Sequence, residues 1–272
     1  MARLKGDKLS KRMPSYRRVV RLLWALFILG ILSIAGIFIF LSYSDLPNTE
    51  ELENPKSELA TEIYSADGVV LGRYYVENRV PVEYNDLSDN IVNALISTED
   101  ERYFKHSGID FYALARASVK PILTGSSAGG GSTITQQLSK LLFTVKPASG
   151  FERVVQKLKE WIIAVRLERK YTKEEIIAMY LNKFDFLYDS DGIKAAAETY
   201  FGKDQKDLSI DEAAILVGML KNPDLYNPKK RPEISKNRRN VVFDQMKRNN
   251  LLTQDGLDSL VQKPISLSLI HI

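Results

Sequence analysis

The chain has 272 residues, of which 44% are hydrophobic, so it is long enough for one sizeable folded domain with accessory segments or for two small domains. Its formal net charge is only +4, but eight Lys and Arg residues lie between Met1 and Arg21 against the single acidic residue Asp7. The basic excess therefore belongs to a tail, which argues against a nucleic-acid-binding face. There are no cysteines, which excludes disulfides and thiolate metal sites.

Residues 22–41 contain no charged side chain. A bilayer core needs about 20 apolar residues in a helix, and this run matches that length. A buried core helix and a cleavable signal peptide are the alternatives, but the run is long for a signal peptide and Ser42–Asp45 offers no small-residue cleavage pattern. We expect an uncleaved anchor with its basic tail in the cytoplasm and the rest of the chain on the periplasmic or outer face.

Beyond the anchor, residues 42–60 are polar and acidic and predict a connector, and residues 61–84 predict a β-hairpin that turns at Asp67-Gly68. Helical patterns follow, with Ser88 as an N-cap and with capping-box spacing at Thr133/Gln136 and Thr172/Glu175. The expected helices cover residues 89–98, 111–123, 133–143, 151–170, 173–182, 193–201, 210–220 and 236–248. The body is therefore predicted to be mainly α.

Two carboxylates stand out as candidates for proton transfer. Glu99 lies beside Asp100 and Glu101, and crowded like charges make one carboxyl of such a group easier to protonate. Glu160 lies between Lys157 and Lys159, which favour its charged form. Glycosyl reactions commonly use two carboxyl groups. A solvated acidic turn and a helix-surface ion pair remain open as alternative interpretations of these two sites.

The segment Gly130–Lys140 is a glycine-rich loop that leads into a polar helix start. The hydroxyls and backbone N–H groups of Ser132 and Thr133 could hold phosphate, and Gln136, Gln137 and Lys140 could add amides and an ammonium on the same face. A capped helix after a flexible loop is the alternative.

Other polar residues carry weaker signals. His106 has no second ligand at helical spacing, so we expect it to be structural and expect no metal ligands. Lys229-Lys230-Arg231 and Arg238-Arg239 are expected to form a solvated face.

Three patches together resemble the peptidoglycan glycosyltransferases. Glu99, Asp100, Phe104, His106 and Gly108 match an E-D-x-x-F-x-x-H-x-G motif. Residues 130–140 match G-x-S-T-I-T-Q-Q-L-x-K, and Lys157 and Glu160 match a third motif. The resemblance runs from about residue 61 to 246 and keeps the order of the motifs.

The resemblance implies a lysozyme-like α-helical glycosyltransferase domain with a small membrane-proximal lobe and a short β-hairpin, preceded by one N-terminal transmembrane helix. It implies lipid II as substrate and a lipid-linked growing glycan as donor, joined in β-1,4 linkage with inversion. By the same resemblance, Glu99 is the general base on the 4-hydroxyl of lipid II, and Glu160 assists departure of the donor's diphosphate.

Further roles follow from the resemblance alone. Substrate contacts are expected from the polar and cationic residues Asp100, Ser132, Thr133, Gln136, Gln137, Lys140, Arg153, Lys157 and Lys159. Phe104, His106 and Gly108 are expected to be structural. No cofactor is required by the sequence, although relatives often use Mg²⁺ or another divalent cation. The expected partners are lipid II, the lipid-linked glycan, the cytoplasmic membrane and other cell-wall synthesis proteins, and no nucleic acid.

The chain departs from the family pattern at Gln156, where an Arg is usual, and at Asp189–Asp191, where many relatives have Asn and small residues. No Ser-x-x-Lys motif of a transpeptidase occurs in the chain, so the resemblance leaves two alternatives, a single-activity enzyme or the glycosyltransferase part of a bifunctional penicillin-binding protein. Residues 61–110 and 182–186 resemble the bifunctional branch, so we expect the second. The expected boundaries are residues 1–21 for the tail, 22–41 for the span, 42–60 for the connector, 61–250 for the glycosyltransferase domain and 251–272 for the start of a linker.

Two other functions remain as alternatives. A lysozyme-like lytic enzyme would cut finished glycan, but it would need no phosphate-binding cluster. The second alternative is a catalytically weak scaffold for cell-wall assembly, which the unusual residues Gln156 and Asp189–Asp191 would support.

Overall fold

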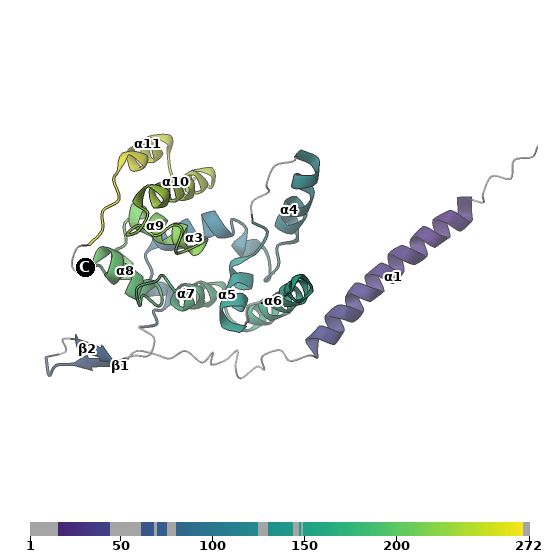
Figure 1. Ribbon diagram of the computed structural model, residues 1–272, viewed down its shortest axis with the longest axis horizontal. Coiled ribbons are helices and arrows are strands. Elements are labelled where there is room, and N and C mark those ends of the chain that lie inside the picture. Colours follow the sequence, from purple (N-terminus) through teal and green to yellow (C-terminus); the bar gives the residue numbers. More distant parts are fainter. Residues whose placement is uncertain are drawn as a thin grey trace, which may run out of the picture. The chain divides into compact units, whose positions relative to one another are not determined.

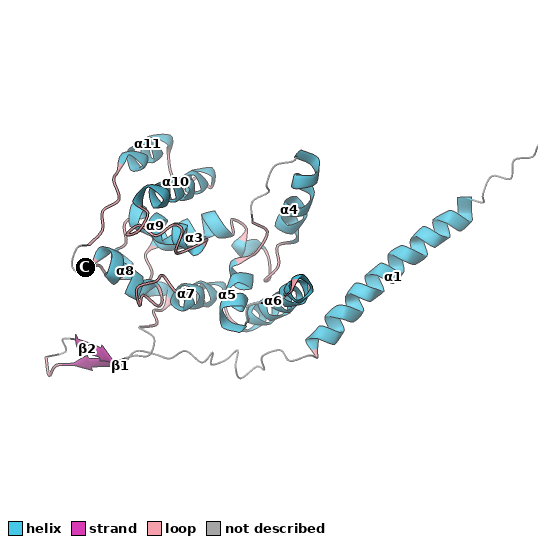
Figure 2. Ribbon diagram, viewed as in Figure 1, coloured by secondary structure: helices cyan, strands magenta, loops and turns pink. Residues whose placement is uncertain are grey.

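The computed structural model describes residues 16–43, 61–67, 70–74, 80–124, 130–143, 147 and 149–268. The chain divides into two compact units, Met1–Leu46 and Pro47–Ile272, and each is described by itself. Figure 1 labels the elements along the chain, and Figure 2 shows that helices predominate among them.

Helix α1 (Tyr16–Ser42) belongs to the first unit. It has 27 residues, its most apolar window has a mean hydropathy of 2.7, and none of that window is buried. At about 1.5 Å of rise per residue, a helix of this length exceeds the roughly 30 Å of a bilayer's hydrocarbon core. In the described residues it is the one helix that could cross a membrane by length and composition, a test that a signal sequence also passes.

The second unit begins with an antiparallel pair of strands, β1 (Thr61–Tyr64) and β2 (Val70–Tyr74). Thr61 pairs with Tyr74, and the register shifts between Ile63 and Tyr64. This confirms the short β-hairpin, although Gly68 of the predicted turn lies outside the described residues.

The remaining elements of this unit are helices. They are η1 (Tyr84–Asp86), α3 (Asp89–Glu99), η2 (Tyr103–Lys105), α4 (Phe111–Thr124), α5 (Ile134–Phe143), α6 (Gly150–Lys170), α7 (Lys173–Lys183), α8 (Ile193–Phe201), η3 (Gln205–Asp207), α9 (Ile210–Leu220), α10 (Pro232–Arg248) and α11 (Gln254–Gln262). The mainly α fold class is confirmed.

Two of the predicted helix caps are present in the structure. The Ser88 side chain accepts from the N–H of Ile91 and caps the start of α3, and Glu99 is the last residue of this helix. Thr172 and Glu175 form the predicted capping box of α7. Helix α11 was not expected, and α10 begins at Pro232 rather than at Lys236, because proline is well suited to the first turn of a helix.

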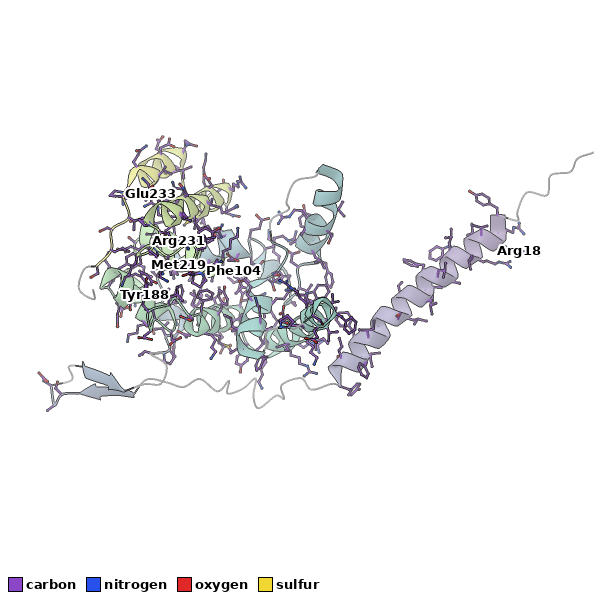
Figure 3. All side chains as sticks on the ribbon, in the orientation of Figure 1. Arg18, Phe104, Tyr188, Met219, Arg231 and Glu233 are labelled. Atoms are coloured by element: carbon purple, nitrogen blue, oxygen red, sulfur yellow. The ribbon has the colours of Figure 1, made fainter. Side chains whose placement is uncertain are left out.

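Helix α9 forms the centre of the core. Every residue from Glu212 to Leu220 is buried, which fits a helix that is apolar on nearly all sides. It packs against α3 and α10 (Figure 1). Met219 on this helix, labelled in Figure 3, is fully buried. A second group joins α5 to α6 and α7. Residues of the candidate site come from both groups, so the packing between these helices determines how the site is built.

Candidate active site

Glu99 lies at the end of α3, where donors from two other helices approach it. The Nε2 of Gln137, on α5, donates to its Oε2 at 2.8 Å. On α10, the Nη2 of Arg238 lies 3.7 Å from Oε1. The carboxylate is 16% exposed, so it is held from both sides and still open to a ligand.

The arginine pair Arg238-Arg239 is not a solvated face, so that expectation is wrong. The Arg238 side chain is 12% exposed, and Arg239 is fully buried with its Nη2 donating to the carbonyl of Lys263 at 2.9 Å. A Cβ at Gly218 would lie 3.1 Å from Cγ of Arg238, so the bare glycine lets this side chain pack against α9. Helical periodicity in α10 could not reveal this, because the partners come from other elements.

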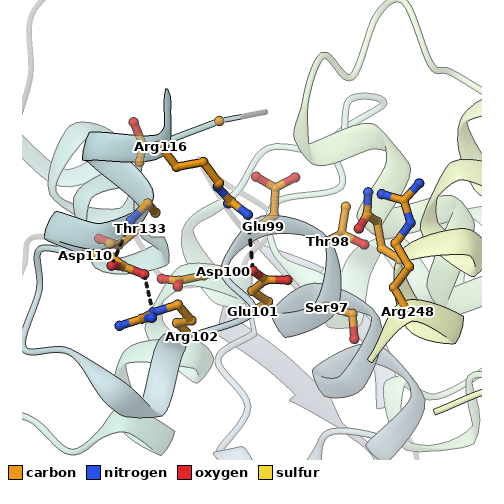
Figure 4. A pocket seen from close by; sticks show the side chains of 15 residues that line it. Ser97, Thr98, Glu99, Asp100, Glu101, Arg102, Asp110, Arg116, Thr133 and Arg248 are labelled. Atoms are coloured by element: carbon orange, nitrogen blue, oxygen red, sulfur yellow. Dashed lines mark hydrogen bonds and ion pairs between the residues drawn. The ribbon is translucent and has the colours of Figure 1, made fainter. Parts of the chain in front are cut away.

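A cavity of about 390 Å³ opens beside Glu99. It is lined by the end of α3, the start of α4, the loop before α5 and the end of α10. The charged side chains that line it besides Glu99 are Asp100, Glu101, Arg102, Asp110, Arg116 and Arg248. Figure 4 shows two ion pairs there, Arg102 with Asp110 at 3.0 Å and Arg116 with Glu101 at 3.4 Å. Ser132 and Thr133 line the same cavity, which places the second sequence motif beside the first.

Asp100 connects the end of α3 to the start of α5. Its two carboxylate oxygens each lie 3.0 Å from Nε2 of His106, and Oδ2 also accepts from the backbone N–H of Ile134 at 3.1 Å. The residue is buried. A carboxylate at a helix N-terminus is favoured by the unpaired N–H groups and the helix dipole there. Asp100 and His106 therefore hold the two motifs together, and a substrate contact by Asp100 stays a prediction.

Gly108 forms a second connection between the same motifs. Its carbonyl accepts from Oγ1 of Thr133 at 2.7 Å and from Nε2 of Gln136 at 3.2 Å. Its φ is +89°, and a Cβ here would lie 2.9 Å from the carbonyl of Ala164. Only glycine fits such a conformation and approach without strain.

The start of α5 differs from the expected phosphate cradle. The N–H of Ile134 is used by Asp100, and the N–H of Gln136 by Oγ1 of Thr133. These two groups are therefore not free for an anion. The capping box is half formed, because the Gln136 amide turns to Gly108 instead of back to Thr133. Gln136 and Thr133 are buried, and their roles as substrate contacts stay predictions.

Glu160 is buried on α6 and both its oxygens are paired. Lys157 Nζ lies 3.0 Å from Oε2, and Gln156 Nε2 donates to Oε1 at 3.1 Å. The same Lys157 ammonium donates to Oγ of Ser132 at 3.0 Å. Gln156, the departure from the family pattern, therefore supports Glu160 rather than leaving it unpaired. Ser132 and Lys157 connect Glu160 to the edge of the cavity that contains Glu99.

The other predicted site residues lie outside that cavity. Lys140 and Arg153 are exposed, Lys159 is half-buried, and none of the three lines it. Within the described residues these cations have no ion pair. Phe104 is 57% exposed and contacts the ring of Tyr103 edge-on, so it does not lie in the core.

A divalent cation would need oxygen ligands arranged around one point. Within the described residues, no group of three His, Asp or Glu side chains is placed to hold one. Glu99 and Glu160 are engaged with N–H donors and cations instead.

The site contains two carboxylates, Glu99 and Glu160, and enzymes that act on glycosidic bonds commonly use a pair of carboxyl groups. The model of the transglycosylase family matches residues 67–247, and the chain belongs to that family.

The chain is also similar to several proteins named penicillin-binding protein 1A. It is 35% identical over 238 residues to the one from Vibrio cholerae, covering 88% of this chain and 28% of that protein. It is 36% identical over 248 residues to the one from Aquifex aeolicus, covering 88% of this chain and 34% of that protein. The chain thus spans about a third or less of the length of these relatives.

A solved structure is similar at a lower level. The crystal structure of penicillin-binding protein 1A from Haemophilus influenzae matches with a TM-score of 0.41 and 22% identity, over 78% of this chain and 22% of that one.

Proposed function

We propose that this chain is a membrane-anchored peptidoglycan glycosyltransferase that polymerises lipid II into β-1,4-linked glycan and releases undecaprenyl diphosphate. The main support for the proposal is that Glu99 and Glu160 are both connected to Ser132, in the loop before α5. Glu99 and Ser132 line the same cavity, and Ser132 is joined through Lys157 to Glu160. Family membership supports the reaction class.

In this reaction Glu99 accepts the proton of the 4-hydroxyl of incoming lipid II, and the freed oxygen attacks the anomeric carbon of the donor glycan. The bond from that carbon to the diphosphate breaks, and its electron pair leaves with undecaprenyl diphosphate. Gln137 and Arg238 restrain the Glu99 carboxylate, so the base is held in place before substrate arrives.

The departing diphosphate needs positive charge. Glu160 contributes by holding the Lys157 ammonium at Ser132, beside the cavity. Lys140, Arg153 and Lys159 are not engaged in ion pairs within the described residues, so they can turn toward a diphosphate. The family resemblance alone suggests a role for Mg²⁺. It is also the only basis for direct substrate contacts by Asp100, Thr133 and Gln136.

A substrate with an isoprenoid tail stays in the bilayer, and α1 would keep the enzyme there too. The eight Lys and Arg residues between Met1 and Arg21 support a cytoplasmic tail by the positive-inside rule. The catalytic unit then lies on the outer face of the cytoplasmic membrane. Because this chain has no cysteine, single cysteines introduced at Lys8 and Lys206 can be labelled with an impermeant reagent on intact spheroplasts. Labelling at Lys8 and not at Lys206 would contradict this orientation.

The activity is tested by incubating the full chain in detergent with labelled lipid II and sizing the products. Long new glycan supports the proposal. Shortening of preformed glycan without new synthesis would indicate a lytic enzyme, and neither product would indicate a scaffold.

Variants then test the two carboxylates. Glu99→Gln should lower glycan synthesis by at least about 100-fold while lipid II still binds, since general base catalysis contributes 10²–10⁴-fold. Glu160→Gln should be severely impaired as well. The matched control is Glu233→Gln, an exposed carboxylate on α10 that does not line the cavity, and it should stay within about threefold of the natural enzyme. Full activity in Glu99→Gln would remove that residue as the base.

A further inference from the structure

Tyr180 lies outside the cavity but is connected to Glu99 through one side chain. It is on α7 and 1% exposed. Its hydroxyl donates to Oε1 of Gln137 at 2.9 Å, and Nε2 of the same amide donates to Oε2 of Glu99 at 2.8 Å. Three helices, α7, α5 and α3, therefore contribute to one line of hydrogen bonds that ends on the carboxylate.

The chemistry of the three groups determines which of them donates and which accepts in each hydrogen bond. An ionised carboxylate can only accept, so the Gln137 amide must turn its NH₂ group to Glu99 and its oxygen to Tyr180. The tyrosine must then donate. Burial, followed by the negative charge of Glu99, raises the pKa of Tyr180 well above its ordinary value, so the hydroxyl keeps its proton at neutral pH.

We propose that Tyr180 is a positioning residue for the carboxylate of Glu99, acting through the side-chain amide of Gln137. The hydroxyl fixes the rotation of the amide, and the amide fixes one carboxylate oxygen. Without the hydroxyl, the Gln137 oxygen would be left partly buried without a partner, and the amide would turn away to find one. The inference rests on the proposed function, because it gives Glu99 the role of base.

The test is Tyr180→Phe in the full chain, assayed with labelled lipid II. We expect kcat to fall about tenfold while KM changes less than about twofold, because neither Tyr180 nor Gln137 lines the cavity and the base is less well held. The matched control is Tyr200→Phe. Tyr200 is also fully buried and its hydroxyl donates to the carbonyl of Phe186 at 2.7 Å, a contact outside the site. That variant should lose stability but keep its kcat.

A double-mutant cycle separates positioning from simple support of the fold. In Gln137→Met, which lacks the amide, adding Tyr180→Phe should cost less than about twofold in kcat. The same tenfold cost in both backgrounds would overturn the proposal, and so would a kcat in Tyr180→Phe equal to that of Tyr200→Phe.

Failure of the proposed function would be recognised separately, because the natural chain would then make no glycan. In that case the double-mutant cycle is measured by urea denaturation, using the midpoints of the natural chain, Tyr180→Phe, Gln137→Met and the double variant. Non-additive midpoints support the line from Tyr180 to Gln137, and additive midpoints overturn it.

Discussion

Nη2 of Arg238 lies 3.7 Å from Oε1 of Glu99, so a cation from α10 accompanies the carboxylate at the end of α3. Both side chains are largely buried, which shields the pair from salt. The guanidinium also lies over the ring of Tyr226, 5.6 Å from its centroid. The proposed base is therefore restrained from α5 and α10, two helices that are distant from it in the sequence.

Arg238→Ala is expected to lower kcat/KM for lipid II about tenfold, a loss of about 1.4 kcal/mol, because the Glu99 carboxylate loses its counter-charge and one of its two restraints. Lys236→Ala, on the same helix, removes a positive charge without touching Glu99 and should stay within about twofold. The measurement is the initial rate of glycan synthesis at low substrate. A rate in Arg238→Ala equal to that of the control would show that the pair has no catalytic role.

Lys157→Met should abolish the link between Glu160 and Ser132. We expect glycan synthesis to fall at least about 100-fold, since a positioned cation at a leaving group is worth several kcal/mol. The free energy of unfolding should fall by about 2 kcal/mol, less than for a fully buried pair, because Lys157 is itself 40% exposed. Urea denaturation measures the second effect. Lys159→Met has no ion pair to lose among the described residues, and a similar loss of stability there would contradict the explanation.

The turn between α7 and α8 contains three consecutive residues in the left-handed region, Leu187, Tyr188 and Asp189, with φ of 68°, 55° and 54°. Tyr188 is labelled on this turn in Figure 3. Asp189 is exposed and makes no described side-chain contact, so Asp189→Gly removes strain without removing packing. We expect a gain of about 0.5–1 kcal/mol in the free energy of unfolding. Asp189→Ala keeps the Cβ and should be less stable than the natural chain; a higher urea midpoint for Ala than for Gly would refute strain as the cause.

Three buried tyrosines make the fold sensitive to alkali. Burial is the main cause that raises the pKa of Tyr103, Tyr180 and Tyr200 above the ordinary value. Above pH ~10 the unfolded chain releases these phenolic protons and the folded chain does not, so stability is complete below that pH and falls as pH rises. The limiting slope is about 1.4 kcal/mol per pH unit for each tyrosine. Urea titrations from pH 8 to 11 measure it, and Tyr200→Phe should reduce the slope. An unchanged slope would contradict this account.

Much of the site could be predicted from local patterns. Ser88 caps the start of α3, whose last residue is Glu99, and Thr172 with Glu175 opens α7. The fixed spacing of the short motifs identifies Gly108 and Ser132. The direction of single side chains could not be predicted in the same way. Gln136 and Gln137 are neighbours in one motif, yet one turns inward to Gly108 and the other reaches Glu99.

The features that the sequence predicts and those that only the tertiary structure determines differ in how far apart the interacting residues lie in the chain. Helix caps, the apolar run of α1 and the motif spacings depend on residues a few positions apart, so the sequence alone predicts them. The contact of Arg238 with Glu99, the capping of α5 by Asp100 and the burial of Arg239 join residues from different helices. Such contacts exist because α9 packs against α3 and α10 and because Gly218 and Gly108 allow close approach, and side-chain packing of that kind emerges when the helices assemble.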